Sequence, residues 1–196
     1  LESLDKELTW RKHGNMGGDA THTYNVRGAW AVLELALVTN DKRYFDAMKG
    51  FVDWALSEER GRGWFDHNCL TDNSSPLLHT IAYTAQGLLE CGLILNDERL
   101  IGAARRTSDE LMNKIEKDGR MPGRFNNAWE GTVKWSCVTG MAQMAIVWQR
   151  LYKLTRDGKY MDAATRVNAF LKKTQDISGR NNGVRGGIVG VRNFFY

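Results

Sequence analysis

Side chains that can bind or transform a ligand gather in three stretches of this sequence, residues 13–27, 64–83 and 124–137. Each stretch mixes aromatic rings with basic and acidic or amide groups, and all four histidines of the chain lie between positions 13 and 79. The ligand-binding candidates are His22, Tyr24, Arg27, Trp64, His67, Arg124, Trp135 and Arg185. Aromatic faces stack on sugar rings, polar groups bind hydroxyls, and a guanidinium binds a carboxylate in a fork. This mixture favours a carbohydrate ligand, and an acidic one would also use the arginines.

One chemistry that fits these residue types is glycoside hydrolysis. It requires two carboxyl groups that flank the scissile bond, one of them with a raised pKa. Asp66, Asp72 and Glu130 are the candidates, and Asp19 is a weaker one. The competing interpretation is that each acid is a solvated loop residue or a helix cap, and for any single acid we favour that interpretation. We retain Asp66 and Glu130 as catalytic candidates.

A second chemistry is that of a lyase or an epimerase, which needs a base and a cation that stabilises an enolate. His22, His67, His79 and Tyr83 could supply these functions with an arginine beside them. A structural hydrogen bond near a helix start is the other role open to His22 and His79, and for His79 the two roles weigh equally. We retain His79 and Tyr83 as catalytic candidates.

Several other classes of protein fit the sequence poorly. The three cysteines, Cys69, Cys91 and Cys137, lie far apart without a C-x-x-C pair, and no H-x-x-x-H or H-E-x-x-H spacing occurs. We therefore expect no disulfide framework, no metal site and no cofactor. The net charge is +4, but the basic residues form no dense stripe, so nucleic acid is not an expected partner. No apolar run approaches the roughly 18 residues of a membrane helix, and we see no signal peptide. This cysteine pattern favours a reducing compartment and with it the cytoplasm, and the sequence leaves the localisation open.

The elements that must position these residues come from an internal repeat. Asp41, Asp97 and Asp157 lie in matching segments that are spaced 56 and 60 residues apart. Each separates an apolar segment from an amphipathic one, so each marks the turn of a helical hairpin. An aspartate at this place can accept an unpaired backbone N–H, and its charge favours the helix start. We therefore expect all three to be N-caps.

The two helices of each hairpin differ in pattern. The first helices, residues 26–38, 82–95 and 138–154, are apolar nearly all round, so we expect them to be buried on most sides. The second helices are amphipathic: in residues 44–56 the apolar side chains recur at i, i+3, i+4 and i+7. This difference predicts an inner row of buried helices and an outer row of amphipathic ones.

We expect a single all-α domain over residues 1–196, with hairpins at about residues 22–58, 76–117 and 136–175. Long glycine-marked segments join the hairpins at the N-terminal ends of the first helices, where the candidate residues lie. Free N–H groups and a positive potential at helix N-termini make this end suited to an anionic ligand.

The two ends of the chain add two expectations. Little strand signal exists apart from the last residues, 188–196. Residues 2–9 have the pattern of the end of a further outer helix, so we expect the chain to start inside a hairpin.

Several short motifs resemble one family of helical proteins. They are Leu78-His79-Thr80-Ile81-Ala82-Tyr83, Met121-Pro122-Gly123-Arg124-Phe125, Trp135-Ser136-Cys137-Val138-Thr139-Gly140 and Val184-Arg185-Gly186-Gly187-Ile188. The chain is similar to six-hairpin or squalene-cyclase-like α/α-toroid proteins, and especially to uncharacterised toroid proteins linked to polysaccharide metabolism. The likeness extends over nearly the whole chain. It implies an α/α-toroid fold in a superfamily that includes glycoside hydrolases, polysaccharide lyases and epimerases. The Asp-rich motif of the superfamily's terpene cyclases is absent.

A closed toroid has more hairpins than the three found here, so the resemblance implies a partial ring. The arc would be a fragment, a reduced homologue or a protomer, and a homo-oligomer that completes the ring is one expectation. The function that the sequence favours is the binding or processing of a glycan, with hydrolysis or lysis of an acidic glycan as the reactions to consider. Whether catalysis occurs stays open.

Two alternatives to a glycan-processing protein remain. Stacked helical hairpins also form non-catalytic scaffolds that bind other proteins. A partial toroid without activity of its own is the other alternative. It predicts a large exposed apolar flank on the first or last inner helix, or an oligomer that hides that flank.

Overall fold

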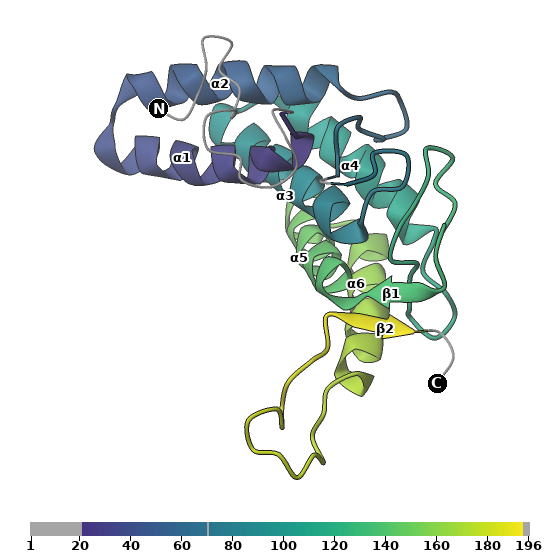
Figure 1. Cartoon of the computed structure of the whole chain (residues 1–196). Coiled ribbons are helices and arrows are strands. Elements are labelled where there is room, and N and C mark those ends of the chain that lie inside the picture. The colour runs from purple at the N-terminus through teal and green to yellow at the C-terminus, as the bar shows by residue number, and fades with distance from the viewer. Residues whose placement is uncertain (1–20, 70, 194–196) are drawn as a thin grey trace.

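The computed structural model describes residues 21–69 and 71–193, which form three helical hairpins and one small sheet (Figure 1). The hairpins pair α1 (Val26–Thr39) with α2 (Lys42–Ser57), α3 (Leu78–Leu95) with α4 (Glu98–Met112), and α5 (Val138–Thr155) with α6 (Gly158–Lys173). A short 3-10 turn, η1 (Thr23–Asn25), precedes α1, and the two strands are β1 (Trp135–Cys137) and β2 (Val191–Asn193). The helix end expected over residues 2–9 lies outside the described residues.

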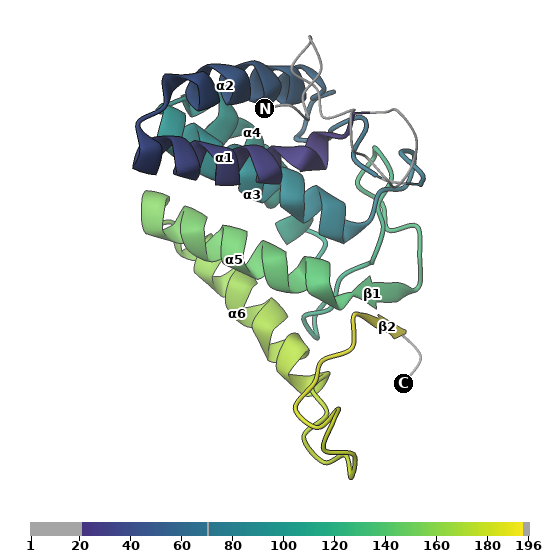
Figure 2. The same ribbon diagram turned by 60° about the vertical axis from the view of Figure 1, so that its left-hand side comes forward.

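The first helices of the hairpins pack side by side in chain order, with α3 between α1 and α5. Each second helix packs mainly on the first helix of its own hairpin, so α2, α4 and α6 form an outer row (Figure 2). Successive hairpins are rotated relative to one another, which bends the row into an arc (Figures 1 and 2). The predicted all-α arc of three hairpins is confirmed.

Each hairpin turns at its aspartate as the sequence predicts. A side-chain oxygen of Asp41, Asp97 or Asp157 accepts a hydrogen bond from the backbone N–H two residues later, at 3.0, 2.9 and 3.1 Å. The residue before each aspartate has a left-handed backbone, with φ between 52° and 60°, and ends the first helix. The three predicted N-caps are confirmed.

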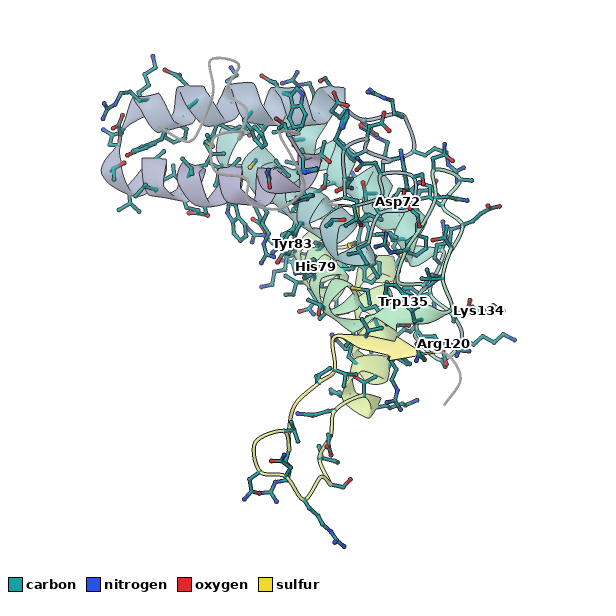
Figure 3. The ribbon with its side chains drawn as sticks, in the orientation of Figure 1. Asp72, His79, Tyr83, Arg120, Lys134 and Trp135 are labelled. Atoms are coloured by element: carbon teal, nitrogen blue, oxygen red, sulfur yellow. The ribbon has the colours of Figure 1, made fainter. Side chains whose placement is uncertain are left out.

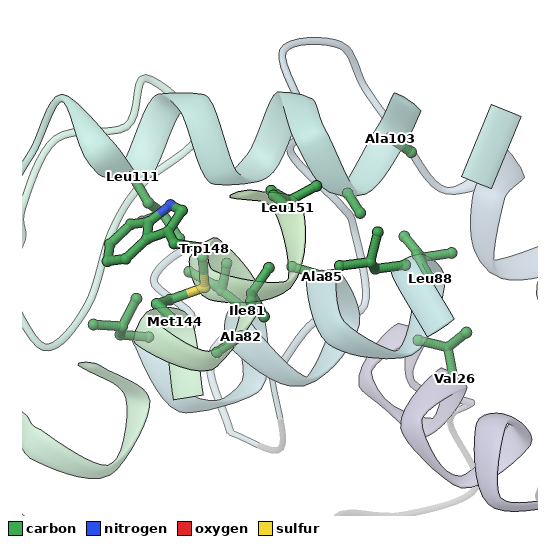
Figure 4. Packing of buried hydrophobic residues seen from close by; sticks show 14 of the residues in the cluster. Val26, Ile81, Ala82, Ala85, Leu88, Ala103, Leu111, Met144, Trp148 and Leu151 are labelled. Atoms are coloured by element: carbon green, nitrogen blue, oxygen red, sulfur yellow. The ribbon is translucent and has the colours of Figure 1, made fainter. Parts of the chain in front are cut away.

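The hydrophobic core lies between the inner and the outer row. Ile81, Ala85 and Leu88 of α3 are buried together with Trp148 of α5 (Figure 4). The indole N–H of Trp148 donates a hydrogen bond of 3.1 Å to the carbonyl of Ser108 on α4. Both apolar packing and this hydrogen bond therefore fix the large side chain in place. The core therefore ties neighbouring hairpins to each other through α3.

Two close backbone contacts set the spacing of the inner helices, one between the start of α1 and the middle of α3 and one between the starts of α3 and α5. A Cβ atom on Gly87 of α3 would lie 2.6 Å from the backbone nitrogen of Arg27 on α1. A Cβ atom on Gly140 of α5 would lie 2.6 Å from the backbone nitrogen of His79 on α3. A side chain at either glycine would force the helices apart. These two glycines therefore bring Arg27 and His79 close to the neighbouring inner helix.

The predicted burial of the inner helices is correct for α3 and wrong for α1. Most residues of α3 are buried, whereas α1 buries only Val26, Ala29, Leu33 and Ala36. Leu35, Leu37 and Val38 are 46%, 54% and 85% exposed. Within the described residues α3 has an inner helix on each flank, and α1 has one on a single flank. The same apolar composition therefore gives different burial.

The start of each inner helix is held by the loop that follows its own outer helix, an arrangement that we call the clasp. Thr23 bonds to His67, Leu77 bridges to Arg124, and Ser136 of β1 pairs with Arg192 of β2. The strand signal predicted at the C-terminal residues is confirmed in β2. The strand β1 was not predicted, because three residues are too short a run for a recognisable alternation.

Candidate functional site

The N-terminal halves of the inner helices present equivalent positions on their sides facing away from the outer row. The second residues of α1, α3 and α5 are Arg27, His79 and Thr139. One turn later the equivalent residues are Ala31, Tyr83 and Gln143. At each of the two positions, two of the three repeats therefore carry a large polar side chain. The close approach of the helices lets side chains of neighbouring repeats meet.

Arg27, His79 and Tyr83 form what we call the inner-face cluster. The guanidinium carbon of Arg27 lies 4.0 Å from the centre of the Tyr83 ring, in a cation–π arrangement. The rings of Tyr83 and His79 have their centres 4.3 Å apart and are tilted by 47°, and Figure 3 shows them side by side. A surface hollow of about 370 Å³ adjoins the cluster and is lined by Tyr24, Asn25, Arg27, Gly28 and Tyr83.

The electrostatics of this cluster keep its histidine neutral. Burial lowers the pKa of His79, the nearby side-chain amide of Gln143 raises it, and the charge of Arg27 lowers it. The net direction is downward, so the ring is an uncharged imidazole at neutral pH and can accept a proton. Burial raises the pKa of Tyr24 to about 12, so its phenol stays protonated and can donate a hydrogen bond.

His22 forms part of the wall behind Tyr24. It is 7% exposed, and its ring stacks on that of Tyr24 with centres 4.9 Å apart and planes 14° apart. Burial lowers the pKa of His22, and neither of its ring nitrogens has a hydrogen-bond partner within the described part of the chain. His67 has an exposed side chain on a left-handed backbone with φ of 54°, and its Nε2 lies 3.6 Å from a carboxylate oxygen of Glu58.

The two carboxylates predicted for hydrolysis have local partners and do not line the hollow of the inner-face cluster. Asp66 accepts a hydrogen bond of 2.6 Å from Arg60, which also pairs with Glu58 at 3.0 Å. Glu130 is exposed and accepts a hydrogen bond of 2.9 Å from the side-chain amide of Asn126. Asp66 and Asn126 contribute instead to a second hollow of about 500 Å³ between the loops, which we call the loop cleft.

The predicted aromatic residues of the loops are packed against protein. Trp64 is 5% exposed and meets Trp129 edge-on at 5.4 Å between ring centres, although it also borders the loop cleft. Trp135 is half-buried and covers Gly123, where a Cβ atom would lie 2.2 Å from the indole. Both rings therefore help to hold the loops in place.

Arg124 and Arg185 lie in different places. Arg124 donates a hydrogen bond to the carbonyl of Ser75 and forms the clasp with Leu77, and its charge helps to lower the pKa of Asp72, after the larger effect of hydrogen bonds from Ser74. Arg185 is exposed in the segment between α6 and β2. It lines a separate hollow of about 300 Å³.

One residue near the site was not predicted from the sequence. Gln143 lies on α5 next to His79. The repeat could have identified Gln143, because Gln143 lies as many residues after the start of α5 as Tyr83 lies after the start of α3. In the third clasp Val191 occupies the place that Arg124 occupies in the second, because Val138 N–H bonds to Gly190 as Leu78 N–H bonds to Gly123. The glycine motif pointed to Arg185, but the residue that pairs with the start of α5 is Val191, so the third clasp has no arginine at the place of Arg124.

Other kinds of site are not evident in the part of the chain that the structure describes. Residues 21–69 and 71–193 contain no group of three or more histidines, cysteines, aspartates or glutamates arranged to hold a metal ion. Among the same residues, no helix has the length and hydropathy needed to cross a membrane. Asp19, one of the acids weighed for hydrolysis, lies outside the described residues.

Comparison with known proteins shows the fold. No protein-family model matches the chain, and no curated protein matches it. An unsaturated glucuronyl hydrolase from Bacillus sp. GL1 superposes with a TM-score of 0.74 at 14% identity, over 93% of this chain and 55% of that one. A cellobiose 2-epimerase from Bacillus thermoamylovorans gives 0.71 at 16% identity, over 88% and 51%. An alpha-1,6-mannanase from a Salegentibacter species gives 0.65 at 15% identity, over 88% and 47%.

These solved structures are six-hairpin α/α-toroids, so the predicted resemblance is confirmed in the fold. The chain spans about half the length of the structures that it matches. An arc of three hairpins within a fold of this kind is consistent with that coverage.

Proposed function

We propose that this protein binds an acidic glycan at the inner-face cluster and that His79 and Tyr83 act on it. The observation that carries the proposal is the stacking of the Arg27 guanidinium on Tyr83, beside an uncharged His79 and next to an open hollow. The fold neighbours support a sugar as ligand, since their names describe a glucuronyl hydrolase, a sugar epimerase and a mannanase.

The geometry suggests how an acidic sugar would bind. Arg27 covers a face of the Tyr83 ring, so that face is not free to stack on a sugar. The outer edge of the guanidinium can bind a carboxylate in a fork, and the ring holds the guanidinium in a fixed plane. The phenols of Tyr24 and Tyr83 are then placed to bind hydroxyls. A uronic acid fits this set better than a neutral sugar does.

Among the candidate reactions, β-elimination from a uronic acid fits this cluster better than hydrolysis by two carboxylates. His79 would take the proton from the carbon next to the carboxylate, and the electron pair of that bond would form the new double bond. The glycosidic oxygen would leave from the neighbouring carbon and take a proton from the Tyr83 hydroxyl. Arg27 would stabilise the negative charge that develops on the carboxylate in the transition state. Hydrolysis through Asp66 and Glu130 would have to use the loop cleft instead.

The proposal is tested by thermal shift with oligosaccharides of uronic acids and with neutral oligosaccharides of the same length. We expect stabilisation by the acidic ligands, which Arg27→Ala abolishes and Arg27→Lys restores only in part. Arg180→Ala, an arginine in the exposed segment after α6, is the control and should bind as the wild type does. Absence of a shift with every acidic ligand would refute the proposal.

The same experiment separates the proposal from a protein-binding scaffold. A scaffold would show no ligand-dependent shift, and His79→Ala or Tyr83→Phe would leave its properties unchanged. For the glycan site, Tyr83→Phe should keep much of the binding and remove turnover of uronate polymers, followed by the ultraviolet absorbance of the new double bond. Equal turnover by Tyr83→Phe and wild type would contradict the role of Tyr83 as proton donor.

We further propose that a second copy of the chain completes the ring. Leu35 occupies in α1 the place that Gly87 occupies in α3, nine residues after the helix start, and Gly87 is where α3 meets the preceding inner helix. The exposed Leu35 therefore marks the flank on which another inner helix would pack, and α5 of a twofold-related copy offers one. Light scattering should give twice the 22.2 kDa of the chain, and Leu35→Glu should give the monomer. A wild-type monomer at high concentration would refute this proposal.

A further inference from the structure

Two buried polar atoms without partners meet at the contact between α3 and α5. Nδ1 of His79 and Oε1 of Gln143 are both shielded from solvent, and neither has a partner in hydrogen-bonding geometry among residues 21–69 and 71–193. Buried polar groups in native proteins are almost always paired, so each of these atoms calls for an explanation. One atom is a donor when it carries a proton and the other is an acceptor, and this makes them chemically complementary.

The packing of the helices keeps these two side chains together. A Cβ atom on Gly140 would lie 2.6 Å from the backbone nitrogen of His79 and 2.7 Å from the carbonyl carbon of Leu78, so the first turns of α3 and α5 are in backbone contact. Gln143 follows Gly140 by three residues and therefore lies on the same face of α5, one turn further. Its side chain is close enough to act on the ionisation of His79.

We propose that Gln143 is a positioning residue for His79. Its Oε1 accepts a hydrogen bond from Nδ1–H, fixes the neutral imidazole in that tautomer and leaves Nε2 without a proton. The tautomer matters because a neutral imidazole donates from one nitrogen and accepts at the other, and only a bare nitrogen can remove a proton. The use made of Nε2 rests on the proposed function, but the tautomer itself does not.

The other neighbours of His79 do not compete for Nδ1. Arg27, from α1, is the charged group that acts on this ring, and it carries donors only. The ring of Tyr83, from the same helix, is tilted by 47° relative to that of His79, with the ring centres 4.3 Å apart. Among these neighbours, Gln143 is the one that supplies a side-chain acceptor from α5.

The test is the tautomer of His79, measured in the ligand-free protein by long-range proton–nitrogen correlation spectra after nitrogen-15 labelling. His79→Asn assigns the signals. We expect Nδ1 to be protonated and Nε2 bare in the wild type, and we expect Gln143→Leu to shift the ring toward the opposite tautomer. Gln149→Leu, the same substitution further along α5, is the matched control and should change nothing. A wild-type ring protonated on Nε2, or a tautomer that Gln143→Leu leaves unchanged, would overturn the proposal.

A second variant covers the case in which Gln143→Leu does not fold. Gln143→Glu keeps the shape and adds a negative charge next to Nδ1, so the pKa of His79 should rise by about 1–3 units. No rise in a folded Gln143→Glu protein would contradict contact between the two side chains. If acidic oligosaccharides fail to bind the wild type but the tautomer is as expected, the proposed function fails and the positioning role of Gln143 stands.

Discussion

Replacing Gly87 by alanine tests whether backbone contact between α1 and α3 sets the geometry of the inner-face cluster. On an isolated helix the change would stabilise the protein by about 1 kcal/mol, because alanine is the better helix former. Here the new methyl would lie 2.6 Å from the backbone nitrogen of Arg27 and from the backbone carbon and a side-chain methyl of Val26. Backbone atoms cannot rotate out of the way, so we take the upper end of the cost of overpacking, about 3 kcal/mol. The net loss is then about 2 kcal/mol.

Gly102→Ala on α4 is the matched control. The nearest atom to its new Cβ is Nη1 of Arg106 at 3.4 Å, the end of a flexible side chain. This variant should gain up to about 1 kcal/mol from helix propensity, so the two alanine variants should differ by about 3 kcal/mol. For a chain of this length that corresponds to a difference in Tm of roughly 6–12 °C by calorimetry or circular dichroism. Equal stability of the two variants would refute the claim that α1 and α3 are in backbone contact at Gly87. Gly87→Ala should also weaken binding of acidic oligosaccharides, because it moves Arg27 away from Tyr83.

Two further predictions concern pH and a buried hydroxyl. Burial lowers the pKa of His22 and His79 below the ordinary 6.5. Just below pH 6.5 the unfolded chain therefore binds more protons than the folded one. The stability that the two neutral rings contribute is present above pH 6.5 and is lost as the pH falls below that value. The urea midpoint should therefore fall on acidification, and a smaller fall is expected in a variant with both histidines replaced by asparagine; an identical fall would count against the burial of the two rings. The hydroxyl of Thr107 donates a hydrogen bond of 2.7 Å to the carbonyl of Gly63. Thr107→Val should therefore lower the free energy of unfolding in urea by about 1–3 kcal/mol. Thr165→Val, on the exposed face of α6, is the control and should lower it far less. Equal effects of the two valine variants would show that the Thr107 hydrogen bond contributes nothing.

The hairpins and their caps were predictable from the sequence because they depend on local chemistry. An aspartate before an amphipathic segment caps a helix whatever lies further away, and Asp41, Asp97 and Asp157 repeat that signal. Burial of α1 was not predictable in the same way. The helix that contains Leu35 and Val38 has the apolar composition of a core helix, but the exposure of these two side chains depends on which other helices lie beside it.

The candidate site was predictable in its residue types and only partly in its grouping. The repeat placed Arg27, His79 and Tyr83 at one end of the inner helices, but their contacts depend on the close approach of the helices at Gly87 and Gly140. Sequence spacing carries no information on such a distance. The same limit explains Asp66: its residue type suits catalysis, but the loop turns it toward Arg60.

The clasps have a consequence for how the molecule can move. Each one closes a loop around a single hairpin, as Thr23 with His67 encloses α1 and α2. Each hairpin is thus a mechanically closed unit, and the seams of the molecule run between hairpins. The inner-face cluster and its neighbour Gln143 lie across these seams: Arg27 belongs to the first hairpin, Tyr83 and His79 to the second, and Gln143 to the third. A small change in the curvature of the arc would therefore alter the distances between these four side chains without breaking any hairpin, so the bend of the arc itself can tune the site.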